Sequence, residues 1–299
     1  MSNGIRYLLG IDGGGTKTEF LLTDSDGNEI RRLFLGNSNP VNQGIENTFN
    51  ILKEGITKIC DDVDMGKISV FAGIAGSKTG ENQKLICDFL SDFGFAFSDC
   101  GSDIDLALEV ALKGENGTCV IMGTGIVAFS RSGKTLQRAG GHGYMIDKGG
   151  SGFHFGSDAL NSAFRYIDSK DGSETILKLV EKNSGKKLDS SVSEIYCGGP
   201  AFVASFAPVI FEAFRMGDPC ATKIIERNAH EASKIINSSR KSLMLSKEKI
   251  VVCGGLCKQK EILYPYLIKY IDSDAPLAFL DEPMVNGAIT LAKRLCENA

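Results

Sequence analysis

A run of three glycines near the start of this 299-residue chain constrains its fold more than any other feature. Gly13, Gly14 and Gly15 separate residues 6–12 from residues 18–24, and both segments have the apolar pattern of strands. Glycine has no Cβ, so the backbone N–H groups of such a turn can approach an anion closely. An ordinary hairpin needs fewer glycines, and neither the P-loop pattern nor GxGxxG before a helix is present. The pattern therefore favours a phosphate-binding turn over a simple hairpin.

The residues that flank the three glycines add the chemistry that a nucleotide site needs. Thr16 and Thr18 would supply hydroxyl donors, and Lys17 would supply a positive charge. Asp12, at the end of the preceding strand, is expected to hold a magnesium ion through water. We therefore expect ATP and Mg²⁺ as cofactors.

A second arrangement of strand, glycine turn and hairpin follows about one half-chain later. Residues 118–122 predict a strand that ends in Gly123, Thr124 and Gly125, although a GxG turn is a weak signal by itself. A third turn, Gly254 and Gly255, ends the predicted strand 249–253. It could let an adenine ring lie against the backbone, or it could be only a tight strand-to-helix connection.

Composition limits the classes of partner that the chain is expected to bind. A net charge of −4 leaves no basic surface of the kind that binds nucleic acid, and no apolar run reaches the roughly 18 residues of a membrane span. The N-terminus lacks an export signal, so we expect a cytoplasmic protein. The nine cysteines are interpreted as buried, reduced thiols, because their odd number and the absence of CxxC favour neither disulfides nor zinc.

Several motifs together are similar to those of a known family. Besides DGGGTKT at 12–18, they are GNSNPVNQG at 36–44, AGIAG at 72–76, GGHG at 140–143, ASFAP at 204–208 and the segment 283–288. The chain resembles the ASKHA superfamily and, more closely, the BadF/BadG/BcrA/BcrD ATPase and N-acetylglucosamine kinase group over essentially its whole length.

This resemblance implies a two-lobed, actin-like α/β fold, which is a duplicated ribonuclease H-like fold with a cleft between the lobes. The predicted N-terminal lobe spans residues 1–112 and is completed by a C-terminal helix at about 286–299. The predicted C-terminal lobe spans residues 113–285 and contains a helical insertion. The resemblance also implies a homodimer and a kinase that phosphorylates an amino sugar such as N-acetylglucosamine or glucosamine.

Asp103 is the candidate catalytic residue. Ser102, Asp103 and Asp105 open a predicted helix, where acids are favoured and where Ser102 with Asp105 could form a capping box. A carboxylate at this place could also accept the proton of a sugar hydroxyl. The resemblance places the base at Asp103 and leaves Asp105 as the cap. It also matches Asn39 to a sugar-contacting position, although Asn39 before Pro40 could merely start a turn.

The chain departs from the family pattern GGWGxxxGDEGSG at residues 140–152. Gly141 is retained, but His142 replaces the tryptophan, Lys148 the sugar-binding aspartate and Gly149 the glutamate. Asp147 lies one position early and could take over the aspartate's role. Lys148 in the acceptor site would suit an acidic sugar, whereas a solvent-facing Lys148 would leave binding to Asp147. Gly141, His142, Asp147 and Lys148 are the substrate-binding candidates.

Two other functions remain open at this point. One is an ATPase activator of the 2-hydroxyacyl-CoA dehydratase type, whose iron–sulfur cluster would need cysteines such as Cys119 and Cys197. The other is a sugar or nucleotide sensor without catalytic activity, which the departures at residues 140–152 would allow.

Overall fold

A computed structural model describes residues 4–297 and divides the chain into two compact units. The first unit extends to Gly114 and includes the C-terminal segment from Glu282 onward, and the second is Glu115–Asp281. The boundary between residues 114 and 115 lies two residues after the predicted boundary between 112 and 113. The boundary between residues 281 and 282 lies four residues before the predicted boundary between 285 and 286.

The first unit is built on a five-stranded sheet in the order β3-β2-β1-β4-β5. Strands β1, β2 and β3 are antiparallel neighbours, whereas β1, β4 and β5 are parallel. The strands are β1 (Tyr7–Gly13), β2 (Thr18–Asp24), β3 (Glu29–Leu35), β4 (Ile68–Ile74) and β5 (Phe97–Gly101).

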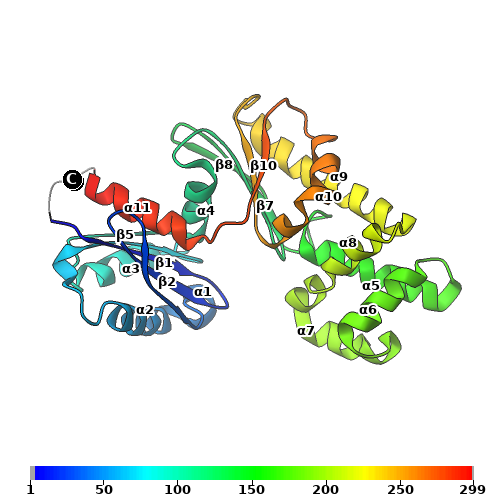
Figure 1. Ribbon diagram of the computed structural model, residues 1–299, viewed down its shortest axis with the longest axis horizontal. Helices are drawn as coiled ribbons and strands as arrows, with labels where there is room; N and C mark the ends of the chain where they lie inside the picture. Colours follow the sequence, from blue (N-terminus) through cyan, green and yellow to red (C-terminus); the bar gives the residue numbers. More distant parts are fainter. Residues whose placement is uncertain (1–3, 298–299) are drawn as a thin grey trace. The chain divides into compact units, whose positions relative to one another are not determined.

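Helices cover both faces of this sheet. The central residues of β1 and β4 are therefore buried. On one face, Leu9, Ile11 and Val70 pack against α2 and α3. On the other face, Leu8 and Phe71 pack against α4 and α11, and Figure 1 shows α11 and α2 on opposite sides of the sheet. The helices of this unit are α1 (Pro40–Gln43), α2 (Ile45–Ile59), η1 (Met65–Lys67), α3 (Asn82–Ser91), α4 (Asp103–Leu112) and α11 (Val285–Glu297).

The second unit repeats the same sheet plan in the order β10-β9-β6-β7-β8. Its central strand β6 pairs antiparallel with β7 and parallel with β9, as β1 does with β2 and β4. The strands are β6 (Gly117–Met122), β7 (Ile126–Ser132), β8 (Thr135–Gly140), β9 (Ile250–Cys253) and β10 (Leu277–Leu280). The repeated plan is that of a duplicated fold.

Most of the second unit's helices lie between β8 and β9 in the sequence, and they share one hydrophobic core with the sheet. These helices are α5 (Gly152–Ser169), α6 (Glu174–Ser184), η2 (Leu188–Ser191), α7 (Val192–Ala204), α8 (Ala207–Arg215) and α9 (Pro219–Lys241). After β9 come η3 (Gly255–Gln259) and α10 (Lys260–Ile268).

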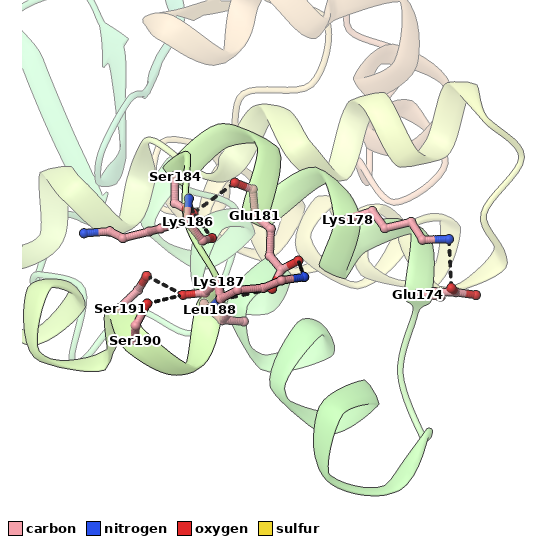
Figure 2. Close-up of polar contacts among 9 residues, drawn as sticks. All are labelled: Glu174, Lys178, Glu181, Ser184, Lys186, Lys187, Leu188, Ser190 and Ser191. Atoms are coloured by element: carbon pink, nitrogen blue, oxygen red, sulfur yellow. Dashed lines mark hydrogen bonds and ion pairs between the residues drawn. The ribbon is translucent and has the colours of Figure 1, made fainter.

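Polar contacts set the sharp connection from α6 to α7. The carboxylate of Glu181 accepts a hydrogen bond from the Leu188 N–H at 3.2 Å and pairs with the Lys187 ammonium at 3.0 Å. The hydroxyls of Ser190 and Ser191 donate to the Lys187 carbonyl (Figure 2). These bonds satisfy backbone groups where α6 has ended and the chain turns through η2.

Helix α7 ends at Ala204 and α8 begins at Ala207, with Pro208 in the first turn, where a missing N–H is tolerated. One expectation from the sequence needs correction. The cysteines are not all buried and reduced. Cys87 of α3 and Cys100 of β5 form a disulfide, and Cys197 is exposed.

No single helix within residues 4–297 combines the length and apolarity of a membrane span. The bent pair Leu188–Ala204 and Ala207–Arg215 meets that test jointly, on length and composition alone. The core face of α8, including Val209, Ile210 and Phe211, is buried in the second unit.

Candidate functional site

The first unit gathers its candidate residues at one edge of the sheet. Strands β1, β4 and β5 are parallel, so their carboxyl ends meet at the same edge. Asp12 lies at the end of β1, and Asp103 begins α4 directly after β5. Asp12 is also the register partner of Glu19 on β2, so these two carboxylates project from the same face.

The three glycines of the first turn have different reasons to be glycine. A Cβ on Gly13 would lie 2.4 Å from both Ile74 Cδ1 and Ser38 Oγ, so the packing of the protein itself excludes a side chain there. At Gly14 and Gly15 the nearest atoms are 3.2 Å away. The Gly14 N–H donates to the Lys17 carbonyl at 2.9 Å and closes the turn. The exposed stretch from Gly15 to Lys17 is therefore the part of the turn that can present N–H groups to a phosphate.

Thr18 does not contribute a free hydroxyl donor, contrary to expectation. Its side chain is fully buried, and its hydroxyl lies 2.7 Å from the Gly36 carbonyl and 2.7 Å from Ser38 Oγ. Thr18 thus holds the chain after β3 against the glycine turn. Thr16, which is exposed, remains the candidate hydroxyl donor of the turn.

Glu19 is a residue that the sequence analysis missed. Its side chain is 8% exposed and forms an ion pair with Arg32, and its Oε2 lies 3.7 Å from Lys17 Nζ. The Lys17 ammonium also lies 4.7 Å from the ring centroid of Phe34. Glu19 therefore anchors Lys17 beside the turn. The pairing of the two strands could have identified Glu19 from the sequence. When Gly13 pairs with Thr18 across the hairpin, Asp12 pairs with Glu19.

Asp12 has an unusually high proton affinity. Burial, and then the negative charges of Glu19 and Asp103, raise its pKa to about 6, while Lys17 acts in the opposite direction. A divalent cation would relieve this repulsion, and carboxylate oxygens are ligands that Mg²⁺ accepts. Among the described residues no three His, Cys, Asp or Glu side chains are arranged to hold a metal directly. Asp12 is the carboxylate at this edge of the sheet that could hold a magnesium ion.

The two acids in the first turn of α4 have different surroundings. Asp105 Oδ2 accepts hydrogen bonds from the Ser102 N–H and the Ser102 hydroxyl, both at 2.8 Å, and lies 3.0 Å from Lys78 Nζ. These bonds make Asp105 the N3 member of a capping box whose N-cap is Ser102. Asp103 is half-buried, and burial is the main cause that raises its pKa, against the N–H groups of the helix start. Its carboxylate is the one available to a substrate.

Asn39 is engaged in a local turn. Its Oδ1 accepts a hydrogen bond from the Val41 N–H at 2.9 Å and caps α1. Gly76 must be glycine here, because a Cβ would lie 2.5 Å from that oxygen. Within residues 4–297 no hydrogen bond is found for the side-chain nitrogen of Asn39, so this nitrogen is the atom that could donate to a sugar.

The glycine turns of the second unit meet at the carboxyl ends of β6 and β9. Gly254 has φ +99°, and a Cβ on it would lie 2.7 Å from the Met122 carbonyl and 3.3 Å from the Gly123 nitrogen. The Gly123 carbonyl in turn accepts a hydrogen bond of 2.7 Å from the Gly152 N–H. Gly254 thus serves the tight connection, whereas Gly125 and Gly255 face open space.

Residues 140–150 form a turn that uses Asp147 internally. Asp147 Oδ2 accepts a hydrogen bond from the His142 N–H at 3.0 Å, and the Asp147 carbonyl lies 2.7 Å from His154 Nε2. Lys148 is exposed and has no ion-pair partner in the described chain. Gly149 packs against α9, where a Cβ would lie 2.8 Å from Glu231 Cβ. The turn therefore presents a cation at the position of the family's aspartate.

Comparison with known proteins places these features in a family. A model of the BadF/BadG/BcrA/BcrD ATPase family matches residues 9–288. An N-acetylmuramic acid/N-acetylglucosamine kinase from Clostridium acetobutylicum is 26% identical over 98% of this chain and 100% of that protein. An N-acetyl-D-glucosamine kinase from Dictyostelium discoideum is 30% identical over 90% of this chain and 91% of that protein.

Solved structures extend the similarity to the fold. A Chromobacterium violaceum protein proposed to be an N-acetylglucosamine kinase superposes with a TM-score of 0.74 at 24% identity, covering 97% of this chain and 99% of that one. A ROK family glucokinase from Streptomyces griseus superposes with a TM-score of 0.65 at 16% identity, with the same coverage. At these identities the likeness concerns the fold alone, and it confirms the predicted two-lobed, actin-like α/β fold.

Proposed function

The chain belongs to the BadF/BadG/BcrA/BcrD ATPase family, and on that premise we propose that it is an ATP-dependent kinase of an amino sugar such as N-acetylglucosamine or glucosamine. Two relatives named as kinases of N-acetylated amino sugars match nearly its whole length. The observation that carries the proposal is the pair of acids at the start of α4. Asp105 alone serves as the helix cap, which leaves Asp103 at the sheet edge beside Asp12 and the glycine turn.

In this proposal the first glycine turn and Lys17 bind the phosphates of ATP. The exposed N–H groups from Gly15 to Lys17 bind phosphate oxygens, and the Thr16 hydroxyl adds a donor. Asp12 holds magnesium through water, and the ion supplies neutralisation of phosphate charge when it is bound. Gly123, Thr124 and Gly125 form the second phosphate turn, and Gly255 with Gly254 forms the adenosine turn.

Asp103 acts on the acceptor hydroxyl. Its carboxylate accepts a hydrogen bond from the hydroxyl and orients the oxygen for attack on the γ-phosphorus. It takes the proton as the new P–O bond forms, while the bond from the γ-phosphorus to the β–γ bridging oxygen breaks and ADP leaves. The raised pKa of Asp103 increases its basicity, because burial disfavours its charged form. Asn39 would donate to the sugar through its side-chain nitrogen.

Gly141, His142, Asp147 and Lys148 are proposed as the part of the acceptor site that sets specificity. Lys148 presents an unpaired ammonium, while the Asp147 carboxylate is bonded within its own turn. These features favour an acceptor with a carboxylate or phosphate group over a neutral one. The remaining elements of the proposal are a homodimer and a cytoplasmic site of action, where ATP is available.

The alternative function as an activator with an iron–sulfur cluster receives no support from the candidate cysteines. A cluster shared between subunits needs thiolates at the surface. Cys119 is fully buried within β6, and only Cys197 of the two is exposed.

The test is ATP consumption, coupled to a spectroscopic assay, against a panel of amino, acetylamino and acidic sugars. Wild type should consume ATP only when a sugar is present, and Asp103→Asn should lose this turnover. Equal sugar-independent hydrolysis by both proteins would refute the kinase assignment. If plain N-acetylglucosamine were the best acceptor, the assignment of Lys148 to an acidic group would be wrong while the kinase assignment stood.

A further inference from the structure

The second unit contains a buried arginine whose guanidinium is only partly hydrogen-bonded. Arg240, in the last turn of α9, is 3% exposed. Its Nη1 donates to Thr118 Oγ1 and to the Glu248 carbonyl, both at 3.0 Å, whereas its Nη2 is buried without any partner. No carboxylate within residues 4–297 forms an ion pair with it. A buried cation in this state is unfavourable unless an anion joins it.

Arg240 lines a pocket of about 750 Å³ between the C-terminal part of α9 and the loop after α10. Ser273, on the opposite wall, contributes a second buried atom without a partner, its Oγ. Two of the three unpartnered buried side-chain atoms of the described residues therefore belong to one pocket. Such atoms are rare in folded proteins, so their coincidence indicates a missing hydrogen-bond acceptor.

More positively charged than negatively charged side chains line the pocket. Lys234, Arg240 and Lys241 line it, against a single carboxylate, Asp272. Lys234 is paired with Glu231, which lies outside the lining, but the exposed Lys241 has no ion-pair partner in the described chain. Burial lowers the pKa of the Arg240 guanidinium by more than the nearby Glu248 carboxylate raises it.

From these contacts we propose that this pocket binds a small phosphomonoester, with the phosphate group between Arg240, Lys241 and Ser273. A phosphate monoester carries nearly two negative charges at neutral pH, and its oxygens accept from a guanidinium fork. The volume suits a phosphorylated polyol or sugar. Both unpartnered atoms are shielded from water, so binding includes a small displacement of the pocket wall.

The pocket is distinct from the nucleotide site. Arg240 contacts Thr118 near the start of β6, whereas the second glycine turn follows the end of that strand. The intervening strand corresponds to roughly 13 Å of extended chain. The pocket shares Lys234 and Ser238 with the cavity lined by His142, Asp147 and Lys148, but Arg240, Lys241 and Ser273 line only the pocket proposed here.

The first test is calorimetric titration of the full chain with ADP and magnesium present, so that the nucleotide turns are occupied. The probes are glycerol 3-phosphate and inorganic phosphate, with glycerol as the uncharged control. We expect glycerol 3-phosphate to bind and glycerol not to bind. If inorganic phosphate binds and the ester does not, the ligand is the free ion. Failure of both phosphates to bind wild type would overturn the proposal.

Matched variants locate the binding. Lys241→Gln and Ser273→Ala should each weaken binding by about tenfold, because each removes a donor to a charged group. Lys247→Gln removes an equal charge from a nearby exposed lysine outside the pocket and should leave binding unchanged. Equal effects of Lys241→Gln and Lys247→Gln would show diffuse attraction instead of a site.

A thermal readout separates binding from a structural role of Arg240. Phosphate should raise the melting temperature of wild type and should not raise that of Arg240→Met. Without phosphate, the variant should melt at the same temperature as wild type or higher, because methionine removes a buried cation whose Nη2 has no partner. A variant that still responded to phosphate would contradict the assignment.

Discussion

Asp103 and Asp105 lie two residues apart in one helical turn, yet Asp105 makes more side-chain contacts within the fold. The Ser102 N–H, the Ser102 hydroxyl and Lys78 all contact the carboxylate of Asp105. The fold therefore tolerates a change at Asp103 better than one at Asp105. This difference makes the two acids a matched pair for experiments.

We expect Asp103→Ala to lower kcat by about 10²–10⁴-fold, the usual range for a general base, while ATP affinity and melting temperature change little. Asp105→Ala should instead lower the free energy of unfolding by about 1 kcal/mol through loss of the cap, with a smaller effect on kcat. Steady-state kinetics and urea denaturation of both variants check this. The reverse pattern would move the catalytic role to Asp105.

Asp12 gives a pH-dependent stability prediction. Its pKa is 3.8 before folding and about 6 in the folded chain, so the native state holds the proton more tightly. The free energy of unfolding should therefore fall as pH rises from about 4 to 6 and then level off. Because Asp12→Asn removes this penalty, the ligand-free variant should exceed wild type at pH 7.5 by up to about 3 kcal/mol.

Urea denaturation at pH 4 and pH 7.5, without nucleotide or magnesium, measures the Asp12 effect. The advantage of Asp12→Asn should shrink at the lower pH, where Asp12 of folded wild type carries a proton and is uncharged. The same variant should bind ATP with less dependence on magnesium. An Asp12→Asn protein that is less stable than wild type at pH 7.5 would contradict the electrostatic account.

Among the elements, α11 shows how the C-terminal segment completes the first unit. Small residues permit its close approach: a Cβ on Gly10 would lie 2.9 Å from the Val285 carbonyl, and one on Gly287 would lie 2.4 Å from the Leu106 carbonyl. The Ser69 hydroxyl donates to the Ala292 carbonyl at 2.6 Å. The helix is therefore an integral layer of the unit.

The ion pair between α11 and α4 should be the electrostatic anchor of this helix. Glu109 is 3% exposed, its Oε2 lies 2.7 Å from Arg294 Nη1, and its Oε1 has no partner. Arg294→Met would leave a buried carboxylate unpaired and should lower the free energy of unfolding by about 3 kcal/mol. Urea denaturation measures this loss.

Lys58→Met is the matched control for Arg294→Met. It breaks the exposed pair of Lys58 with Glu54 on α2, which solvent screens, so its effect should be far smaller. Losses of similar size in the two variants would show that burial of Glu109 does not matter.

For the whole molecule, the two units differ in how the chain builds them. The second unit is continuous, Glu115–Asp281, whereas the first needs the C-terminal segment from Glu282 onward. Residues 115–281 should therefore fold when expressed alone and unfold cooperatively. A chain ending at 281 should lose the first unit, because Leu8, Phe71 and Leu106 would become exposed.

Amide NMR spectra of these two fragments check the prediction. Dispersed signals are expected for 115–281 and for only that part of the chain ending at 281. A fully dispersed spectrum of the truncated chain would show that α11 is dispensable.

Local patterns in the sequence were sufficient to predict several elements of the fold. Apolar runs of 5–7 residues ended by glycine marked β1, β6 and β9, since burial on both faces demands such runs. Local patterns also predicted the Asp105 cap, because a capping box lies within one helical turn. Helix ends were less certain, as the break before Pro208 shows.

By itself, the sequence determined the duplicated α/β plan, the three glycine turns and the position of Asp103, because each depends on residues that are neighbours in the chain. Only the tertiary structure decided what surrounds the first glycine turn. Strand register put Glu19 beside Asp12, and packing against Ser38 withdrew the Thr18 hydroxyl. Contacts between distant segments also paired Cys87 with Cys100 and left Arg240 Nη2 without a partner beside a pocket. Such contacts depend on how the elements pack, which no local spacing of residues records.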